Sequence, residues 1–413
     1  MLGKVNLRIA ILHPAFTSVG GAEILALNQA KCLLMLGHKV TIVTSAVNEA
    51  RWRDELRQFQ VRQLAARDWL DVLGGRELWI ARRVRQLSPL IADMDVAIAH
   101  NYPMSRVLAH ARTTCRKIWY CNEPYREIHL AAAHPTLAAR SRDGAAPTTM
   151  ADVHFRRKFA KQQKWAFNLD QKFVGEGRRD LRTVNKIDLL CANSNYAREL
   201  AIRTYGPRPC KVLYPAIQFP ASSERRHGLG RSQLRVLAHT RLVPEKNVDT
   251  VLRGFAQFVG RAKLNASLSV VGEGPCREPL ERLARELGVE QLVRFHGFVS
   301  ELELRRIYDN CDVFALLPID EPFGMVFPEA AARGLLLIGP DHGGPLEIME
   351  GGKNGFAADT FSPASLADVF ERITQLSDEE IERTRDRAEE SCRRRFSEKA
   401  IASQIESVYE LTK

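Results

Sequence analysis

Short apolar segments alternate with longer amphipathic ones along most of the chain. In the first half, a helix is predicted from about Ala22 to Leu36, and Gly37 is a normal C-cap for it. Six other segments are apolar at nearly every position, which is typical of strands covered on both faces: residues 7–12, 39–44, 95–100, 117–121, 188–194 and 211–215. Repeated strand–helix units predict a parallel sheet with right-handed crossovers.

A second alternating series follows a polar stretch at 216–233, which is rich in Ser, Arg and Gly and is predicted to be an interdomain linker. After the last of its strands the chain is predicted to be helical, with an amphipathic stretch at about 378–411. The predicted strands of this series are residues 234–240, 267–272, 292–298, 312–317 and 335–339. The pattern predicts an α/β protein with two doubly wound, Rossmann-like domains facing each other across a cleft.

The expected domains are an N-terminal domain at 1–215, a C-terminal domain at 234–390, and a terminal helix at 391–413. Residues 125–182 fit the alternation least well and are assigned to the first domain as a helical insertion. Within it, 131–149 is predicted to be a surface loop. The following stretch, 155–180, is basic and contains five interleaved aromatics: Phe155, Phe159, Trp165, Phe167 and Phe173. These aromatics either pack on the domain, which we favour, or lie on an anionic membrane.

Composition is that of a globular protein of 413 residues, with 45% hydrophobic and 26% charged residues. No apolar run approaches the ~20 residues of a membrane span, and the apolar run near the start is too short for a signal peptide. Eight cysteines without a CxxC pair indicate buried thiols in a reducing compartment. We therefore expect a cytoplasmic protein.

Charge is distributed unevenly. Residues 1–215 hold 34 Lys and Arg against 18 Asp and Glu, whereas the remainder holds 26 against 31. A basic half favours an anionic partner, such as the inner face of a membrane or a phosphorylated acceptor; the alternative is a solvated basic face. The two interpretations are equally open at this point.

The most informative segment runs from Pro318 to Gly334, where Glu321 and Glu329 are separated by seven residues. An apolar, strand-like run precedes it, and a small-residue helix is predicted to begin near Val326. A helix N-terminus at the end of a strand attracts phosphate oxygens. One carboxylate can then accept hydrogen bonds from sugar hydroxyls, and the other from a ribose diol.

Arg241 and Lys246 follow another predicted strand and precede a helix with apolar periodicity. Arginine can bridge phosphate oxygens in a bidentate manner, and lysine supplies a point charge. A pair of exposed residues beside a turn is the simpler alternative. The position of both cations at a strand end favours a diphosphate site.

These segments and their order resemble the retaining glycosyltransferases of family 4, whose two-domain architecture is called GT-B. The resemblance rests on the Glu321/Glu329 segment, the Arg241–Lys246 segment and four further matches: Gly20-Gly21-Ala22-Glu23, Val271-Gly-Glu-Gly-Pro275, His296-Gly-Phe-Val299 and Gly343-Gly-Pro-Leu-Glu347. It covers roughly residues 5–25 and 185–375. It implies that the last helix crosses back to the first domain.

The resemblance also implies roles for individual residues. Arg241 and Lys246 would stabilise the departing diphosphate, Glu321 would bind donor-sugar hydroxyls, and Glu329 would hold the ribose hydroxyls. The other implied donor contacts are Gly20, Gly21, Gly272, Gly274, Gly297, Phe298, Val299, Phe323, Gly324, Met325 and Val326. No cofactor is expected beyond the nucleotide-diphosphate sugar, which is a co-substrate, and no metal, although Asp93-Met-Asp95 has the form of a metal-binding DxD.

On the acceptor side the sequence departs from the family. Asn122 stands where many members carry a histidine. Glu123 could replace that histidine, as could His100 at the end of the preceding strand, which we take as the catalytic candidate; His13 at the end of the first strand is a further candidate. This departure affects acceptor handling more than donor binding.

The sequence thus predicts a retaining, metal-independent hexosyltransferase that acts on a glycan or a lipid-linked acceptor. A sugar-nucleotide epimerase or a phosphorylase of related fold is one alternative, although no pyridoxal-phosphate lysine is identifiable. A basic nucleic-acid-binding protein is another, and it would give Glu321 and Glu329 no role; we expect no nucleic acid partner.

Overall fold

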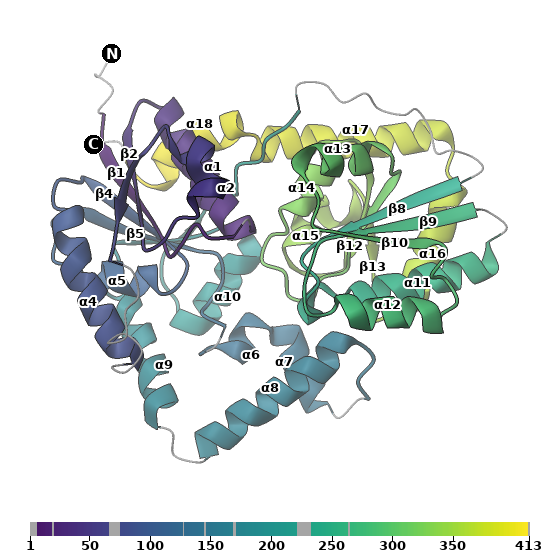
Figure 1. Ribbon diagram of the computed structural model, residues 1–413, viewed down its shortest axis with the longest axis horizontal. Helices are drawn as coiled ribbons and strands as arrows, with labels where there is room; N and C mark the ends of the chain where they lie inside the picture. The colour runs from purple at the N-terminus through teal and green to yellow at the C-terminus, as the bar shows by residue number, and fades with distance from the viewer. Residues whose placement is uncertain are drawn as a thin grey trace. The chain divides into compact units, whose positions relative to one another are not determined.

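The computed structural model describes residues 6–18, 20–65, 75–126, 128–143, 146–167, 171–220, 233–262 and 265–411. The chain divides into two compact units. The first unit comprises residues 1–133, 166–217 and 396–413, and the second comprises 134–165 and 218–395. Both are α/β, as the alternating pattern predicts (Figure 1).

The first unit is built on a parallel sheet of seven strands in the order β3-β2-β1-β4-β5-β6-β7. Its strands are β1 (Arg8–His13), β2 (Lys39–Thr44), β3 (Gln60–Gln63), β4 (Val96–His100), β5 (Arg116–Cys121), β6 (Leu189–Ala192) and β7 (Cys210–Val212). Six of them match the apolar segments of the sequence. The edge strand β3 was not predicted, because its exposed sequence Gln-Val-Arg-Gln lacks a buried apolar face.

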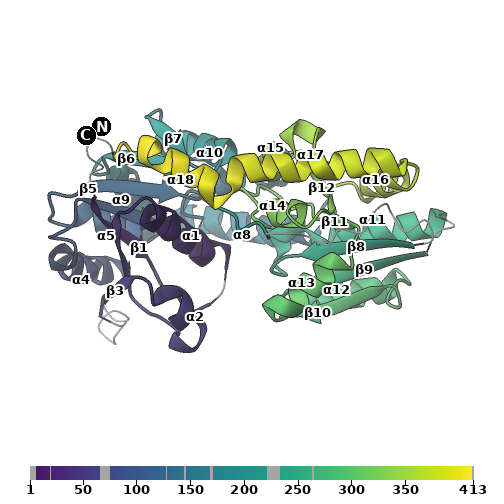
Figure 2. The same cartoon turned by 90° about the horizontal axis from the view of Figure 1, so that it is seen from above.

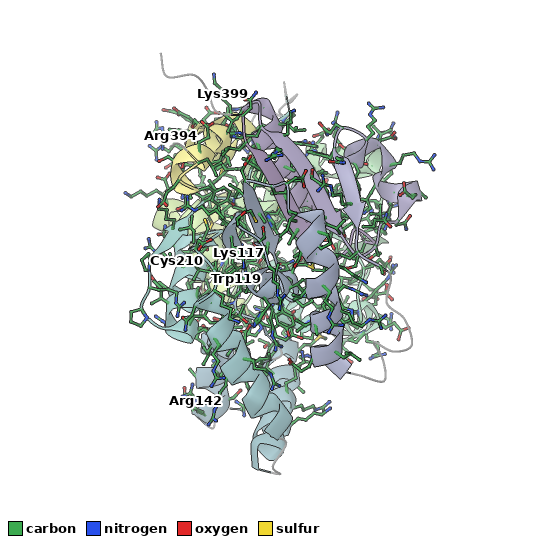
Figure 3. All side chains as sticks on the ribbon, turned by 90° about the vertical axis from the view of Figure 1, so that its left-hand side faces the viewer. Lys117, Trp119, Arg142, Cys210, Arg394 and Lys399 are labelled. Atoms are coloured by element: carbon green, nitrogen blue, oxygen red, sulfur yellow. The ribbon has the colours of Figure 1, made fainter. Side chains whose placement is uncertain are left out.

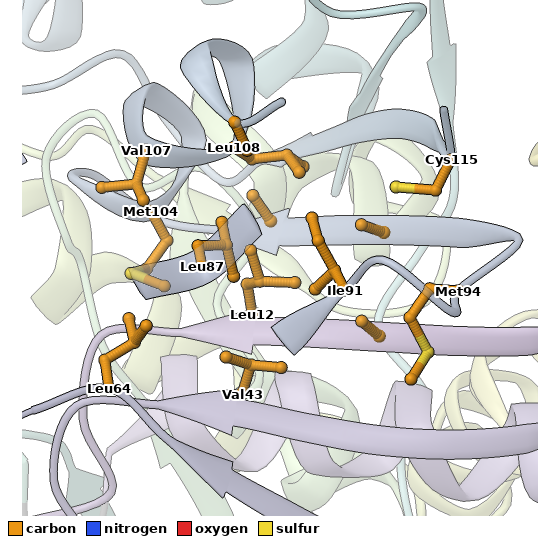
Figure 4. Close-up of a cluster of buried hydrophobic side chains, with 14 of the residues drawn as sticks. Leu12, Val43, Leu64, Leu87, Ile91, Met94, Met104, Val107, Leu108 and Cys115 are labelled. Atoms are coloured by element: carbon orange, nitrogen blue, oxygen red, sulfur yellow. The ribbon is translucent and has the colours of Figure 1, made fainter. Parts of the chain in front are cut away.

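Helices cover both faces of this sheet. They are α1 (Gly21–Met35), α2 (Glu49–Leu56), α4 (Gly75–Leu90), α5 (Met104–His110), α6 (Leu130–Ala133), α9 (Gln171–Val184), α10 (Asn195–Tyr205) and α18 (Glu398–Val408). On one face, α4 and α5 pack on β1, β2 and β4 through a buried cluster that includes Leu12, Leu87 and Val107 (Figure 4). Trp119 and Cys210, both labelled in Figure 3, belong to the adjoining cluster beneath α9 and α10.

The end of the chain packs on the first unit. The expected terminal helix is divided at Ser397, whose side chain accepts a hydrogen bond from the Ala400 backbone N–H and so caps a new helix. The first part, α17 (Asp378–Phe396), belongs almost wholly to the second unit, and α18 packs beside α1 (Figure 2). A terminal helix that returns to the first domain is what the family resemblance implies.

The second unit is built on a parallel sheet of six strands in the order β10-β9-β8-β11-β12-β13. The strands are β8 (Gln233–His239), β9 (Asn265–Val271), β10 (Val293–Gly297), β11 (Val313–Ala315), β12 (Leu336–Pro340) and β13 (Phe356–Ala358). The edge strand β13 was not predicted from its three residues. Most of the proposed linker, residues 221–232, lies outside the described residues.

The helices of this unit include two from the middle of the chain. They are α7 (Pro135–Arg142), α8 (Met150–Phe167), α11 (Val248–Arg261), α12 (Arg277–Glu286), α13 (Glu301–Asp309), α14 (Val326–Ala331), α15 (Gly343–Ile348), α16 (Pro363–Thr374) and α17, with 3-10 turns at Pro244–Lys246 and Glu350–Gly352. The expected insertion at 125–182 is therefore divided between the units, and the predicted loop at 131–149 contains α7.

Specific contacts hold residues 134–165 on the second unit. The Met150 backbone N–H donates to the buried Asp249 carboxylate at 2.8 Å, and the Arg140 guanidinium lies 3.9 Å above the Phe361 ring. Phe155 is 1% exposed and packs against His134. The packed interpretation is thus confirmed at Phe155, while the side chains of Trp165, Phe167 and Phe173 lie outside the described residues.

Candidate active site

The middle of the second sheet positions the candidate donor site. β8 is flanked by β9 on one side and β11 on the other, so the strand order reverses there. In doubly wound sheets, ligands bind beyond the carboxyl ends of the strands at such a switch point. The loop after β8 carries Arg241 and Lys246, and the loop after β11 carries Glu321.

Glycines allow the loop after β9 to lie against the loop after β8, and the loop after β12 to lie against the loop after β11. A Cβ on Gly272 would lie 1.9 Å from the Thr240 carbonyl oxygen, and one on Gly274 would lie 2.2 Å from that of Leu242. On the other side, a Cβ on Gly344 would lie 2.2 Å from the Pro322 carbonyl oxygen. A side chain at any of these positions would push apart the loops that follow neighbouring strands.

Lys246 and Glu321 come from different loops and form an ion pair between Nζ and Oε2. Their side chains are 21% and 15% exposed, so the pair is partly shielded from water. Asn247 is the N-cap of α11 and has a left-handed backbone conformation, with φ 55°. Its Nδ2 donates hydrogen bonds to the carbonyl oxygens of Leu317 and Thr360. Arg241 is exposed on the same loop.

Glu329 lies in the first turn of α14, as predicted. Burial raises the pKa of its carboxyl to about 7, and the positive charge of Arg333 opposes the rise. Phe323 is buried, and Gly324 has φ 87°, which turns the chain into α14 at Met325 and Val326. Glu321 thus lies on the loop that follows β11, and Glu329 lies on the helix that follows this loop.

Three residues near Glu329 were not predicted from the sequence. The hydroxyl of Tyr308 lies 2.9 Å from Nδ1 of His239, and the guanidinium of Arg333 lies 5.2 Å from the Tyr308 ring centre. Burial lowers the pKa of His239 to about 4, so this imidazole is neutral and can accept from the tyrosine. Of this cluster, only the contact between Glu329 and Arg333 could have been predicted from the sequence, because residues four positions apart on a helix are neighbours.

Asp320, immediately before Glu321, is a further unpredicted residue. It is 1% exposed and has φ 53°, a left-handed conformation that aspartate tolerates better than most residues. Its carboxylate accepts hydrogen bonds from the backbone N–H groups of Thr136 at 3.1 Å and Leu137 at 3.3 Å, in the first turn of α7. The segment inserted between β5 and β6 therefore anchors the loop that carries Glu321.

The remaining donor-side residues lie at two other strand ends. Gly297 has φ 71° and ends β10, and Phe298 beside it is 64% exposed, followed by Val299. In the first unit, Gly20 is extended and α1 begins at Gly21, so the turn after β1 needs no positive φ.

Two acceptor-side candidates, His13 and His100, lie in the core of the first unit. His100 is 0% exposed and its Nε2 lies 2.8 Å from Oε1 of Gln29; His13 is 2% exposed. Burial lowers their pKa values to about 3 and about 4 respectively. Both imidazoles are neutral at pH 7, and the catalytic role of His100 stays a prediction.

Asn122 and Glu123 lie at the carboxyl end of β5 and are partly exposed. Nδ2 of Asn122 donates to Oδ1 of Asn101 at 2.8 Å. The Glu123 carboxylate accepts from Nε of Arg126 at 2.6 Å. These residues, unlike the two histidines, have surface that a substrate can reach.

The DxD-like aspartates belong to ion pairs. Arg62 donates to both carboxylate oxygens of Asp93, and this hydrogen bonding lowers the pKa of Asp93. Asp95 accepts from the Arg8 backbone N–H at 2.7 Å at the start of β4. Both carboxylates thus have structural partners.

Known proteins resemble this chain at the levels of sequence and fold. At 30% identity it matches N-acetyl-alpha-D-glucosaminyl L-malate synthase of Bacillus anthracis over 45% of this chain and 48% of that protein. At 30% identity it also matches a GDP-mannose-dependent alpha-(1-6)-phosphatidylinositol monomannoside mannosyltransferase of Mycobacterium tuberculosis over 45% of this chain and 52% of that protein. The chain thus spans about half the length of these curated relatives.

Among solved structures, Anabaena HepE, in complex with UDP and glucose, superposes with a TM-score of 0.71 at 19% identity, over 98% of this chain and 100% of that one. This likeness shows the two-domain GT-B fold. Residues 19–218 match the family model described as Glycosyltransferase Family 4, and residues 222–395 match Glycosyl transferases group 1. Both halves of the chain point to the same family, and the protein is a member of the family 4, group 1 glycosyltransferases.

Proposed function

We propose that this protein is a retaining, metal-independent hexosyltransferase that uses a nucleotide-diphosphate sugar and a glycan or lipid-linked acceptor. The observation that carries the proposal is the pairing of Lys246 with Glu321, from the loops after β8 and β11, at the switch point of the second sheet. A cation and a carboxylate at this point suit the two ends of a donor, the diphosphate and the sugar hydroxyls.

In the proposed reaction, the bond between the anomeric carbon and the diphosphate oxygen breaks, and the acceptor hydroxyl oxygen bonds to that carbon on the same face. The acceptor proton passes to the departing diphosphate. Arg241 and Lys246 supply positive charge as negative charge develops on the leaving oxygen. The relatives' names support the donor class, since one protein was solved with UDP and glucose and another is GDP-mannose-dependent.

The experiment that tests this proposal is thermal unfolding of the purified protein with UDP, GDP, ADP and dTDP and their hexose conjugates. We expect one nucleotide to raise the midpoint temperature, because a ligand that binds only the native state stabilises it. The shift should be lost in Glu329→Ala and retained in Glu286→Ala, an exposed glutamate at the end of α12. No shift with any nucleotide would remove the proposal.

The pH dependence of nucleotide binding tests the role of Glu329. A ribose diol donates to an ionised carboxylate, and with a pKa of about 7 the ionised fraction rises from about a tenth at pH 6 to nine-tenths at pH 8. We therefore expect nucleotide affinity, measured by calorimetry, to rise about tenfold over this range. Glu329→Gln should abolish the rise; an equal rise in that variant would show that another group titrates.

The same pKa has the opposite effect on the nucleotide-free protein. The unfolded chain loses this proton near the ordinary value of 4.5, whereas the folded protein keeps it until about pH 7. The folded state thus binds more protons in this window, so its free energy of unfolding falls as the pH rises from 4.5 to 7. Glu329→Gln should flatten this part of the stability profile.

The excess of basic residues in 1–215 supports a proposed location in the cytoplasm, with the acceptor at the anionic inner face of a membrane. Within the described part of the chain, no helix combines the length and the apolar character of a membrane span. Binding to phosphatidylglycerol vesicles that weakens with salt would support this location.

A further inference from the structure

A row of asparagines follows three adjacent strands of the first unit. Asn101 comes directly after β4, Asn122 after β5 and Asn193 after β6. Nδ2 of Asn122 donates to Oδ1 of Asn101 at 2.8 Å, and Nδ2 of Asn193 reaches Oδ1 of Asn122 at 3.4 Å. The row therefore runs along the carboxyl edge of the sheet, where doubly wound folds bind their ligands.

One end of this row has unused hydrogen-bonding capacity. Asn193 is 5% exposed, and no donor among the described residues reaches its Oδ1. A buried amide oxygen without a partner has lost its hydrogen bonds to water, and such groups in native proteins are normally satisfied. The oxygen at this position is suited to accept a hydrogen bond from a bound molecule.

Aromatic rings flank the row. Tyr102 and Tyr125 follow Asn101 and Asn122 by one and three residues, and their rings stack with centres 3.8 Å apart and 13° between planes. Both side chains are partly exposed. Aromatic surface beside a few fixed polar groups is the usual composition of a small-molecule site.

The polar groups of this edge are uncharged or paired. Each asparagine amide both donates and accepts, as a sugar hydroxyl does, whereas a phosphate or carboxylate only accepts and favours a cation. The nearby cation Arg126 is engaged by Glu123. Beyond β6, Nδ2 of Asn195 donates to the Tyr214 hydroxyl at 3.0 Å, which extends the neutral surface toward β7.

We propose that Asn101, Asn122 and Asn193, with Tyr102 and Tyr125, form a binding site for an uncharged sugar ring. This inference rests on the proposed function, because the bound ring would be the acceptor sugar that receives the hexose. The basic surface of the first half would then contact a different, anionic part of the acceptor or its membrane. The sugar bonded to the reacting hydroxyl carries no charge.

Saturation-transfer NMR with the full chain tests this site. The neutral probes are the methyl α-glycosides of glucose, mannose, galactose and N-acetylglucosamine. The anionic probes are glucuronate, galacturonate and glucose 6-phosphate. We expect at least one neutral probe to bind and each anionic probe to bind about tenfold more weakly, since one lost or mismatched hydrogen-bond pair is worth about 1.4 kcal/mol.

Variants assign any binding to this row. Asn122→Ala should weaken the neutral probe by about tenfold or more. Asn122→Asp, which keeps the volume, should do the same because a carboxylate cannot donate the hydrogen bond that Nδ2 of Asn122 gives to Oδ1 of Asn101. The matched control is Asn185→Ala, an exposed asparagine that lies before β6, at the opposite end of the strand.

The outcomes separate this inference from the proposed function. Binding by anionic probes as strong as by neutral ones, no binding by any neutral probe, or equal loss in Asn185→Ala would each overturn the neutral-sugar site. The nucleotide-induced thermal shift depends on the second unit. If that shift is present while the sugars fail, only the acceptor inference falls; if it is absent, the proposed function itself falls.

Discussion

Lys246→Ala is expected to lower donor-saturated turnover by about 10²–10³-fold while weakening donor binding far less. An ammonium group that faces the leaving diphosphate stabilises charge that develops only in the transition state, so its removal affects turnover more than ground-state binding. Turnover would be followed as release of the nucleoside diphosphate from the donor that the thermal-shift panel identifies. Donor affinity would be measured separately by calorimetry.

Two further variants make this measurement specific. Lys246→Arg keeps the charge but changes its geometry, so it should retain more turnover than alanine does. Lys353→Ala removes an exposed lysine from the same unit and should leave turnover unchanged. Lys246 partners Glu321 at the predicted site. If Lys246→Ala kept its turnover within twofold of the parent, Lys246 would not stabilise the leaving diphosphate, and the proposed role would be excluded.

Asp320→Ala is expected to lower the free energy of unfolding of the second unit by about 2–3 kcal/mol, which is roughly 5–10 °C in midpoint temperature. The buried carboxylate accepts two backbone hydrogen bonds from the start of α7, and alanine would leave both donors without their acceptor. Alanine also tolerates the left-handed backbone at this position less well than aspartate. Differential scanning calorimetry would measure the change.

The contact with α7 can be tested from its other side. Thr136→Pro removes one of the donated N–H groups, at the helical position that follows Pro135. If the two groups act through one contact, the double variant should be less destabilised than the sum of the single variants. Additive effects would show that Asp320 stabilises the loop without α7. Asp320→Asn, which keeps an oxygen acceptor, should recover part of the loss.

Several parts of the site could be predicted from local sequence because they depend on local order. The apolar strands, the glycine at position 324 and the first-turn Glu329 are set by neighbours within a few residues, and the structure has them where the pattern predicts. Edge strands β3 and β13 were not predicted, because their formation does not depend on local order. A short strand with exposed residues carries no local signal, and its pairing with β2 or β12 is a long-range contact.

Other features depend on contacts that no local pattern encodes. His100 ends a strand, as expected, but its partner Gln29 lies 71 positions away, and burial makes the imidazole neutral. Asp320 and Thr136 are 184 positions apart. The sequence predicted a loop where α7 forms, because the alanine-rich stretch has no strong helical periodicity and gains its stability from the second unit.

The sequence by itself determined the alternation of strands and helices, the order of the family's motifs, and the residue types at the donor loops, since these depend on local spacing and composition. Only the tertiary structure decided which side chains meet: Lys246 with Glu321, Asp320 with the start of α7, and the asparagine row along the first sheet. Each of these contacts depends on strand order and loop packing. These bring together residues that are tens to hundreds of positions apart in the chain, and burial then sets which of them are charged.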